Sequence, residues 1–148
     1  MGLSSFRDLP NDARLWVFGF ARPLSKRDTE NIKKHLDAFL PRWTSHQVPV
    51  RGAYTVLYDR FVLVAGHCPE GLSGCSMDSC VSNFKQLKAG CGLDALNRSL
   101  VFYRDREGQV QCLDRPSFQR KVDSAEITPS STVFDTTLQK LTSPSLLY

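Results

Sequence analysis

The stretch Phe61-Val62-Leu63-Val64-Ala65-Gly66-His67 decides the fold, because its first five residues form the longest purely apolar run of the chain. A short apolar run that is rich in β-branched and aromatic residues is typical of a strand buried on both faces. We therefore predict a central strand over residues 61–65. It ends at Gly66-His67, and a glycine-punctuated loop, residues 71–80, leads from it into a helix.

The segments before this strand predict two more strands and a helix. Residues 15–20 (LWVFGF) are almost continuously apolar and predict a second buried strand. Residues 50–58 alternate and predict a third strand, joined to the central one by a tight turn at Asp59-Arg60. Between them, apolar residues at helical spacing predict a helix that is capped by Ser25 and ends near Pro41.

The segments after the central strand predict a second helix, two strands and a short helix. The second helix is predicted to begin at a Ser76 cap and to end at Gly90, which can adopt the left-handed conformation of a helix end. Residues 100–103 and 110–112 predict strands, and residues 118–122 predict the short helix.

The order of these elements predicts an α+β fold with a ferredoxin-like split βαβ core. Its antiparallel sheet would have strands one and three in the centre and strand four outside strand one, with an added C-terminal strand and a short helical tail. Right-handed connections then bring the end of helix one, the end of strand three and the start of helix two to one edge. The loop from Trp43 to His46 is therefore expected near His67 and Cys75.

A chain of 148 residues is the size of one domain. We predict a flexible leader over residues 1–13 and a single α+β domain over residues 14–148, in which the tail after Pro129 has no clear pattern. No apolar run is long enough to span a membrane, and the first residues lack the apolar core of a secretion signal. These patterns predict a cytoplasmic protein without a membrane partner.

The charge pattern argues against a nucleic-acid partner, and the cysteine pattern argues against disulfides. The formal net charge is +4, but the basic residues are scattered among acidic ones, which is typical of solvated surface. The basic and aromatic signature of RNA recognition modules is absent, so a nucleic acid is not a predicted partner. Five cysteines without a Cys-x-x-Cys pair predict free thiols. Cys80, Cys91 and Cys112 fall on apolar faces and are predicted to lie in the core.

The start of the second helix carries the predicted site. Unpaired backbone N–H groups at a helix start favour an anion or a thiolate. We predict a small anionic molecule as ligand, with Cys75 as a nucleophile and His46 or His67 as its base if the protein is an enzyme, a question that the sequence leaves open. The predicted ligand-binding residues are Trp43, Ser45, Ser73, Gly74, Ser76 and Asp78.

Three alternatives stand beside this site. The loop can be purely structural, and the protein can act instead through its sheet or through a homo-oligomer interface. A zinc site of His46, His67, Cys68 and Cys75 is a lesser alternative, because its spacing matches no zinc pattern, and no metal or cofactor is predicted. The chain has no P-loop sequence. His35 lies beside the apolar stripe of the first helix, a position typical of a packed or surface histidine.

Three motifs carry a family resemblance. Trp43-Thr-Ser-His46, Tyr58-Asp-Arg60-Phe61, and Ser73-Gly-Cys-Ser-Met-Asp78 with the following Phe84-Lys-Gln-Leu87 resemble motifs of a family of small uncharacterised bacterial proteins. Some members of that family are labelled ABC transporter ATPase, although a P-loop is missing here. The resemblance covers residues 14 to 135 and implies that Trp43, His46, Gly74, Cys75, Ser76 and Asp78 are shared positions. It implies no established activity.

Overall fold

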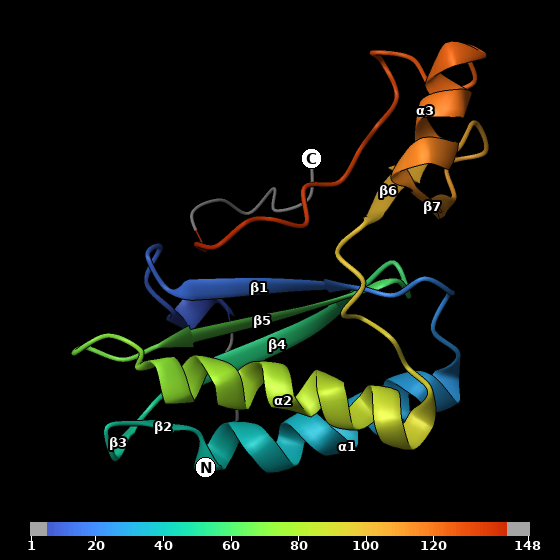
Figure 1. Cartoon of the computed structure of the whole chain (residues 1–148). Helices are drawn as coiled ribbons and strands as arrows, with labels where there is room; N and C mark the ends of the chain where they lie inside the picture. Colours follow the sequence, from blue (N-terminus) through green and yellow to red (C-terminus); the bar gives the residue numbers. More distant parts are fainter. Residues whose placement is uncertain (1–5, 142–148) are drawn as a thin grey trace.

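The computed structural model describes residues 6–141, and the chain has an α+β fold. The main sheet has three strands, β1 (Arg14–Gly19), β4 (Arg51–Leu57) and β5 (Phe61–His67), in the order β1-β5-β4 (Figure 1). Both neighbouring pairs are antiparallel. The apolar run that was predicted to be central is central, because β5 lies between β1 and β4, and every residue from Phe61 to Gly66 is buried.

Two helices cover one face of this sheet (Figure 1). Helix α1 (Lys26–Phe39) begins at Ser25 with a reciprocal capping box to Asp28, as the Ser25 cap predicted. It ends just before Pro41, and a 3-10 turn, η2 (Leu40–Arg42), follows it. Side chains of alternate β1 residues, Trp16 and Phe18, pack against these helices in the first core.

Helix α2 (Gly74–Cys91) starts earlier than the sequence predicted. Its cap is Ser73, whose side chain accepts a hydrogen bond from the backbone N–H of Ser76, so the predicted Ser76 cap is wrong. Ser76 lies instead in the first turn and is 2 % exposed. The helix ends at Gly92, which has the left-handed φ of 68°, rather than at Gly90.

The opposite face of the sheet carries a second core. It contains Leu15, Phe61 and Leu63 from the sheet, together with Phe102 and Phe134 from later segments. The leader predicted over residues 1–13 contributes to this layer from residue 6 onward. It forms a 3-10 turn, η1 (Phe6–Asp8), and buries Leu9 and Ala13. Residues 1–5 lie outside the described residues.

The strand predicted over residues 100–103 does not join the main sheet. Strand β6 (Leu100–Arg104) pairs with β7 (Val110–Asp114) in a separate antiparallel hairpin, which α3 (Arg115–Asp123) follows. The physical reason is that β6 packs by its side chains on the face of the sheet. The ring of Phe102 lies 5.0 Å from that of Phe61, and it occupies the space where a Cβ atom on Gly19 would lie.

The tail connects this hairpin to the main sheet. The backbone N–H of Phe134 donates to Phe102, and the N–H of Leu15 in β1 donates to Gln139. The tail between residues 130 and 141 forms isolated bridges and no helix, and Phe134 and Leu141 are buried in the second core. Residues 142–148 of the predicted tail lie outside the described residues.

Two tight hairpin turns place residues other than glycine in the left-handed conformation. The turn between β4 and β5 has Tyr58 and Asp59 at φ values of 57° and 51°, so it lies one residue before the predicted Asp59-Arg60 turn. A second turn at His46 and Gln47 joins the short strands β2 (Thr44–Ser45) and β3 (Val48–Pro49). Both turns have the two central left-handed residues of the type I′ hairpin.

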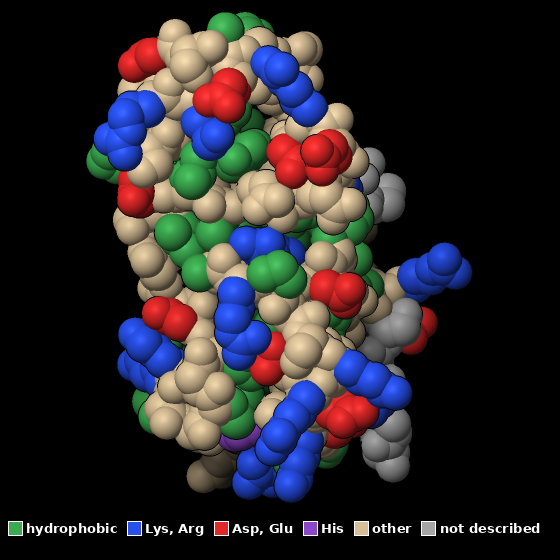
Figure 2. All heavy atoms as spheres, turned by 90° about the vertical axis from the view of Figure 1, so that its right-hand side faces the viewer, with side chains coloured by type: hydrophobic (Ala, Val, Ile, Leu, Met, Phe, Trp, Pro, Cys, Tyr) green, Lys and Arg blue, Asp and Glu red, His purple; other side chains and the backbone are tan. Residues whose placement is uncertain are grey.

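The surface is mixed in charge. Figure 2 shows Lys and Arg side chains interspersed with Asp and Glu on the face it presents, with hydrophobic side chains gathered across its middle. This pattern agrees with the solvated surface expected from the scattered charges. Within residues 6–141, no helix has the length and apolarity needed to cross a bilayer.

Candidate functional site

The two loops that the topology was predicted to bring together do meet. The indole N–H of Trp43 donates to the backbone oxygen of Ser76 at 2.8 Å, and this contact is buried. The hydroxyl of Ser45 donates to the oxygen of Gly71 at 3.0 Å and accepts from the N–H of Ser73 at 2.9 Å. These three contacts and the Ser73 cap hold the start of α2 against the β2–β3 hairpin, and we call this arrangement the clamp.

This clamp changes the role of four predicted ligand-binding residues. The polar groups of Trp43, Ser45 and Ser73 are used in contacts with the chain itself, and the hydroxyl of Ser76 donates to the oxygen of Ser73 at 2.7 Å. A buried polar group that is already paired has little capacity for a ligand. These four residues therefore have a structural role in the clamp, and the prediction that they bind a ligand is not needed to explain them.

The predicted nucleophile, Cys75, and its two predicted bases, His46 and His67, lie near the clamp but are not hydrogen-bonded to each other in the part of the chain that the structure describes. Cys75 is exposed in the first turn of α2, and a Cβ atom on the neighbouring Gly74 would meet nothing within 4 Å. His46 is exposed at the tip of the β2–β3 turn. His67 is half-buried and lines a cavity of about 360 Å³ together with Arg14. No hydrogen bond joins Cys75 to either histidine among residues 6–141.

The cysteines are free, and their surroundings differ. Cys80 is buried as predicted, and this burial raises the pKa of its thiol. Cys91 was predicted to lie in the core, but it is exposed because it is the last residue of α2. Cys68 is buried and Cys112 is half-buried. Within the described part of the chain, no three His, Cys, Asp or Glu side chains gather as metal ligands would.

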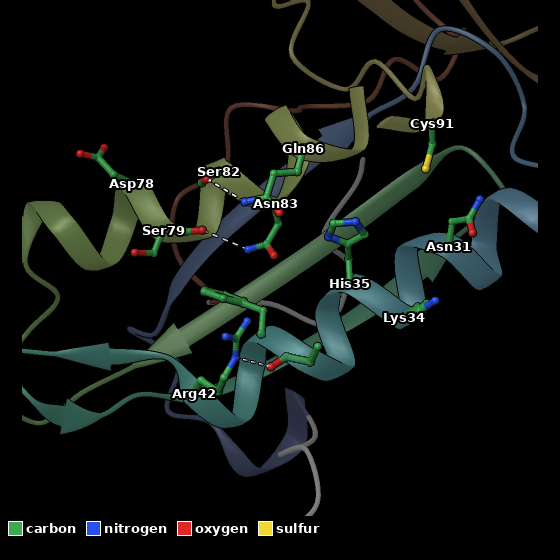
Figure 3. A pocket seen from close by; sticks show the side chains of 12 residues that line it. Asn31, Lys34, His35, Arg42, Asp78, Ser79, Ser82, Asn83, Gln86 and Cys91 are labelled. Carbon is green, nitrogen blue, oxygen red and sulfur yellow. Dashed lines mark hydrogen bonds between the residues drawn. The ribbon is translucent and has the colours of Figure 1, made fainter. Parts of the chain in front are cut away.

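A larger concavity lies between the two helices, next to the clamp. This α1–α2 groove has a volume of about 930 Å³ and is open to solvent. From α1 it is lined by Ala38 and Phe39 and by polar or basic side chains at helical spacing. These polar or basic side chains are Asn31, Lys34, His35 and, just beyond the helix, Arg42 (Figure 3).

The facing wall of the α1–α2 groove comes from α2. Its side chains carry hydroxyl and amide groups, at Ser79, Ser82, Asn83 and Gln86. Asn83 is 6 % exposed, and its side-chain nitrogen donates to the backbone oxygens of Ser79 at 3.0 Å and Cys80 at 3.2 Å. Its side-chain oxygen has no hydrogen-bond partner among the described residues. His35 and Asn83 point into the space between the helices from opposite sides (Figure 3).

The α1–α2 groove carries an excess of positive charge. Neither Lys34 nor Arg42 forms an ion pair with a carboxylate of residues 6–141. The Nε of Arg42 donates to the backbone oxygen of Ala38 at 2.8 Å, which fixes this side chain along the end of α1. Asp78 is the groove's acidic residue and the one predicted site residue that lines it, and its side chain points away from α1 (Figure 3).

Sequence reasoning missed the basic wall of this groove, although a signal for it exists. Lys34, Ala38 and Arg42 follow one another at intervals of four residues, and Ser79, Asn83 and Gln86 do so at intervals of four and three. Such spacing places each set on one helix face. The pattern does not tell which faces look at one another, because that depends on how the helices pack.

The chain was compared with family models, curated proteins and solved structures, and none of them matches. The candidate site therefore stands on the geometry of this chain.

Proposed function

We propose that the protein binds a small anionic molecule in the α1–α2 groove, beside the start of α2. The observation that carries the proposal is the basic wall formed by Lys34 and Arg42, which no carboxylate of the described residues neutralises, on a concavity of about 930 Å³. This volume lies in the range of ordinary small-molecule sites. An anion held there would pair with the ammonium group of Lys34 and with the guanidinium group of Arg42, which its bond to Ala38 holds along the end of α1.

The facing wall supports a more specific ligand class. The side-chain oxygen of Asn83 is an acceptor with no partner in the described chain, on the wall of the α1–α2 groove. A ligand hydroxyl or amine would satisfy it, while Ser82 and Gln86 offer further polar contacts. The proposed ligand is therefore a small phosphate or carboxylate that also carries a hydroxyl or amino group.

We favour ligand binding over a reaction at the thiol of Cys75. Cys75 is exposed in the first turn of α2, but no hydrogen bond joins it to His46 or His67 within the described residues. The proposed binding needs no thiol. We also propose membership of the bacterial family, a cytoplasmic location and a ferredoxin-like core. The order β1-β5-β4 supports the core for three of its four strands, since β6 pairs with β7 instead.

Isothermal titration calorimetry with glycerol 3-phosphate, inorganic phosphate and glycerol tests the proposal on the full chain. We expect glycerol 3-phosphate to bind more tightly than phosphate, and glycerol not to bind. Replacing both basic residues, Lys34→Gln with Arg42→Gln, is expected to weaken binding about tenfold, because two charge-assisted contacts are lost.

The matched control is Lys85→Gln, which removes one positive charge from an exposed position of α2 outside the groove. It is expected to leave binding within about twofold of the wild type at moderate salt, where distant surface charges are screened. Equal losses in the control and in the double variant would contradict the proposal. So would glycerol 3-phosphate binding that the double variant leaves unchanged.

A further inference from the structure

The outer edge of β1 has backbone groups that nothing in the described chain uses. The N–H of Leu15 faces outward and donates to Gln139 at 2.9 Å, whereas the N–H of Phe20 faces β5 and donates to Arg60 at 2.9 Å. Backbone groups of successive residues alternate in direction along an antiparallel strand. Val17 and Gly19 therefore present their N–H and C=O groups outward, and none of these has a hydrogen-bond partner among residues 6–141.

A cavity of about 350 Å³ lies along this edge, so no other segment of the described chain covers it there. Its other walls are the connector over residues 95–100 and the tail over residues 136–139. Apart from the bond between Leu15 and Gln139, the backbone bonds of these walls are local: Ser99 donates to the side chain of Asn97, and Thr137 donates to the side chain of Asp135. Neither wall continues the sheet beyond Leu15. The position of a fourth strand beside β1 is therefore unfilled.

The cavity is positively charged. Arg14 and Arg98 line it, and no aspartate or glutamate does. Neither arginine forms an ion pair with a carboxylate of residues 6–141. Arg14 lies over the Trp16 ring, 4.9 Å from its centroid, and donates to the side-chain oxygen of Gln139 at 3.3 Å. Its buried Nε has no hydrogen-bond partner in the described chain. A strand that enters this space meets two arginines that have no carboxylate partner in the described chain.

We infer that β1 is a docking edge that accepts an extended acidic segment of a partner protein as an added strand. The main chain of that segment pairs with Val17 and Gly19, in the manner of β-strand addition. Its carboxylate side chains contact Arg14 and Arg98, which supply specificity for an acidic sequence. This surface is separate from the α1–α2 groove, so it adds a protein partner to the proposed small ligand.

A second copy of this chain is a poorer occupant of the edge. If β1 paired with β1 of another copy, the arginines of both copies would line the same interface. Like charges that face each other across an interface are unfavourable, whereas an acidic strand removes this repulsion. The charge of the cavity thus selects a partner segment over self-association.

The test is a display selection of short random peptides on the full chain, followed by amide hydrogen exchange measured by NMR. We expect the selected peptides to be rich in Asp and Glu, and their binding to protect the amides of Val17 and Gly19. Before peptide is added, these two amides should exchange faster than those of Trp16 and Phe18, which face β5.

Variants connect the peptides to the edge. Arg14→Gln with Arg98→Gln should weaken binding of a selected peptide about tenfold. Arg115→Gln, on an exposed arginine outside the cavity, should leave it unchanged. Arg98→Gln alone, on an exposed side chain, gives a reading if the double variant fails to fold.

Four results would overturn the inference: no binding peptide in the selection, selected peptides without acidic enrichment, bound peptides that leave Val17 and Gly19 unprotected, or equal losses in the Arg115→Gln control. Protection of both amides that rises with protein concentration, without peptide, would assign the edge to a second copy instead. Protection in dilute free protein would mean that the chain itself fills it.

Discussion

At the scale of single residues, Trp43 is the side chain on which the neighbourhood of the site depends. It is 2 % exposed, its ring packs on Trp16 and Phe39, and its N–H reaches across to Ser76 in α2. The apolar contacts and the hydrogen bond act together, because the bond fixes the ring orientation that the packing requires. This residue therefore holds the end of α1 against the start of α2.

Trp43→Phe is expected to lower the free energy of unfolding by about 2 kcal/mol, because it leaves a cavity and removes a buried donor. Urea denaturation followed by circular dichroism measures this loss. The control is Tyr54→Phe, which removes a part-buried hydroxyl that donates to Asp37 at 3.0 Å and should cost less than about 1 kcal/mol. A Trp43→Phe variant as stable as the wild type would mean that the clamp is dispensable.

Asp28 makes the stability of the fold depend on pH. The hydrogen bond from the Arg22 guanidinium, helped by the backbone N–H of Ser25, lowers the pKa of the Asp28 carboxyl from 3.8 to about 2. A carboxyl with a lowered pKa stabilises the fold above its unfolded-state pKa, and this contribution is lost as the pH falls through the folded value. The relevant window therefore lies between about pH 4 and pH 2.

We expect wild-type stability to fall by about 1 kcal/mol more than that of Asp28→Asn across this window, after allowance for the screening of the exposed Arg22. Denaturation at a series of pH values measures the difference. Glu30→Gln, on an exposed position of the same helix, should keep the full wild-type dependence. If Asp28→Asn shows the same pH profile as the wild type, the ion pair does not stabilise the helix start.

At the scale of elements, the close approach of the clamp to β5 depends on a glycine. A Cβ atom on Gly66 would lie 2.5 Å from the ring of Trp43, a distance that cannot exist without movement of the ring. Gly74, at the start of α2, has open space around it instead. The two glycines thus differ in purpose, although both lie close to the same loop.

Gly66→Ala is expected to destabilise the protein by about 2 kcal/mol through overpacking. Gly74→Ala should be neutral or stabilise it by about 0.5 kcal/mol, because alanine favours the helix and loses less backbone entropy on folding. Thermal unfolding of both variants measures the contrast. Equal effects would show that the ring of Trp43 does not lie over Gly66.

The elements themselves were largely predictable, and their ends were less so. The runs 15–20 and 61–65 and the Ser25 cap identify elements because burial and capping act locally. The start of α2 was misplaced because Ser73 and Ser76 are both good caps, and the choice depends on Ser45, which lies far away in sequence. Likewise, a glycine-free turn at Tyr58 and Asp59 gives no strong local signal.

At the scale of the whole molecule, the hairpin β6–β7 and the tail form a second layer on the sheet. Phe134 connects them: its ring lies 5.1 Å from that of Phe61, and its backbone pairs with Phe102. The sequence order of elements predicted β6 as an edge strand of the main sheet. It could not show that Phe102 fits over Gly19, because this contact joins residues far apart in the chain.

Phe134→Ala should cost about 3 kcal/mol, because it empties a buried aromatic site. It should also speed amide exchange at Arg104 and Leu15, whose N–H groups donate to the tail. Val133→Ala, on the neighbouring 42 % exposed side chain, should change stability by less than about 0.5 kcal/mol. Slow exchange retained at both amides in Phe134→Ala would mean that the ring does not hold the tail.

The candidate site was predictable only in part, for the same reason. The meeting of the Trp43 loop with the start of α2 followed from topology. The α1–α2 groove did not, because its walls depend on the packing angle of two helices. As a result, Asp78 was predicted as a site residue, whereas Lys34, Arg42 and Asn83 were not.

The binding of a small anion in the α1–α2 groove is the central claim, and NMR chemical-shift mapping of the full chain with glycerol 3-phosphate tests it most directly. The account predicts saturable shifts at the amide groups of Lys34, His35 and Arg42 and at the side-chain amide of Asn83, and their loss in the Lys34→Gln with Arg42→Gln variant. Saturable shifts confined to Gly74, Cys75 and His67, or no saturable shifts at all, would contradict it.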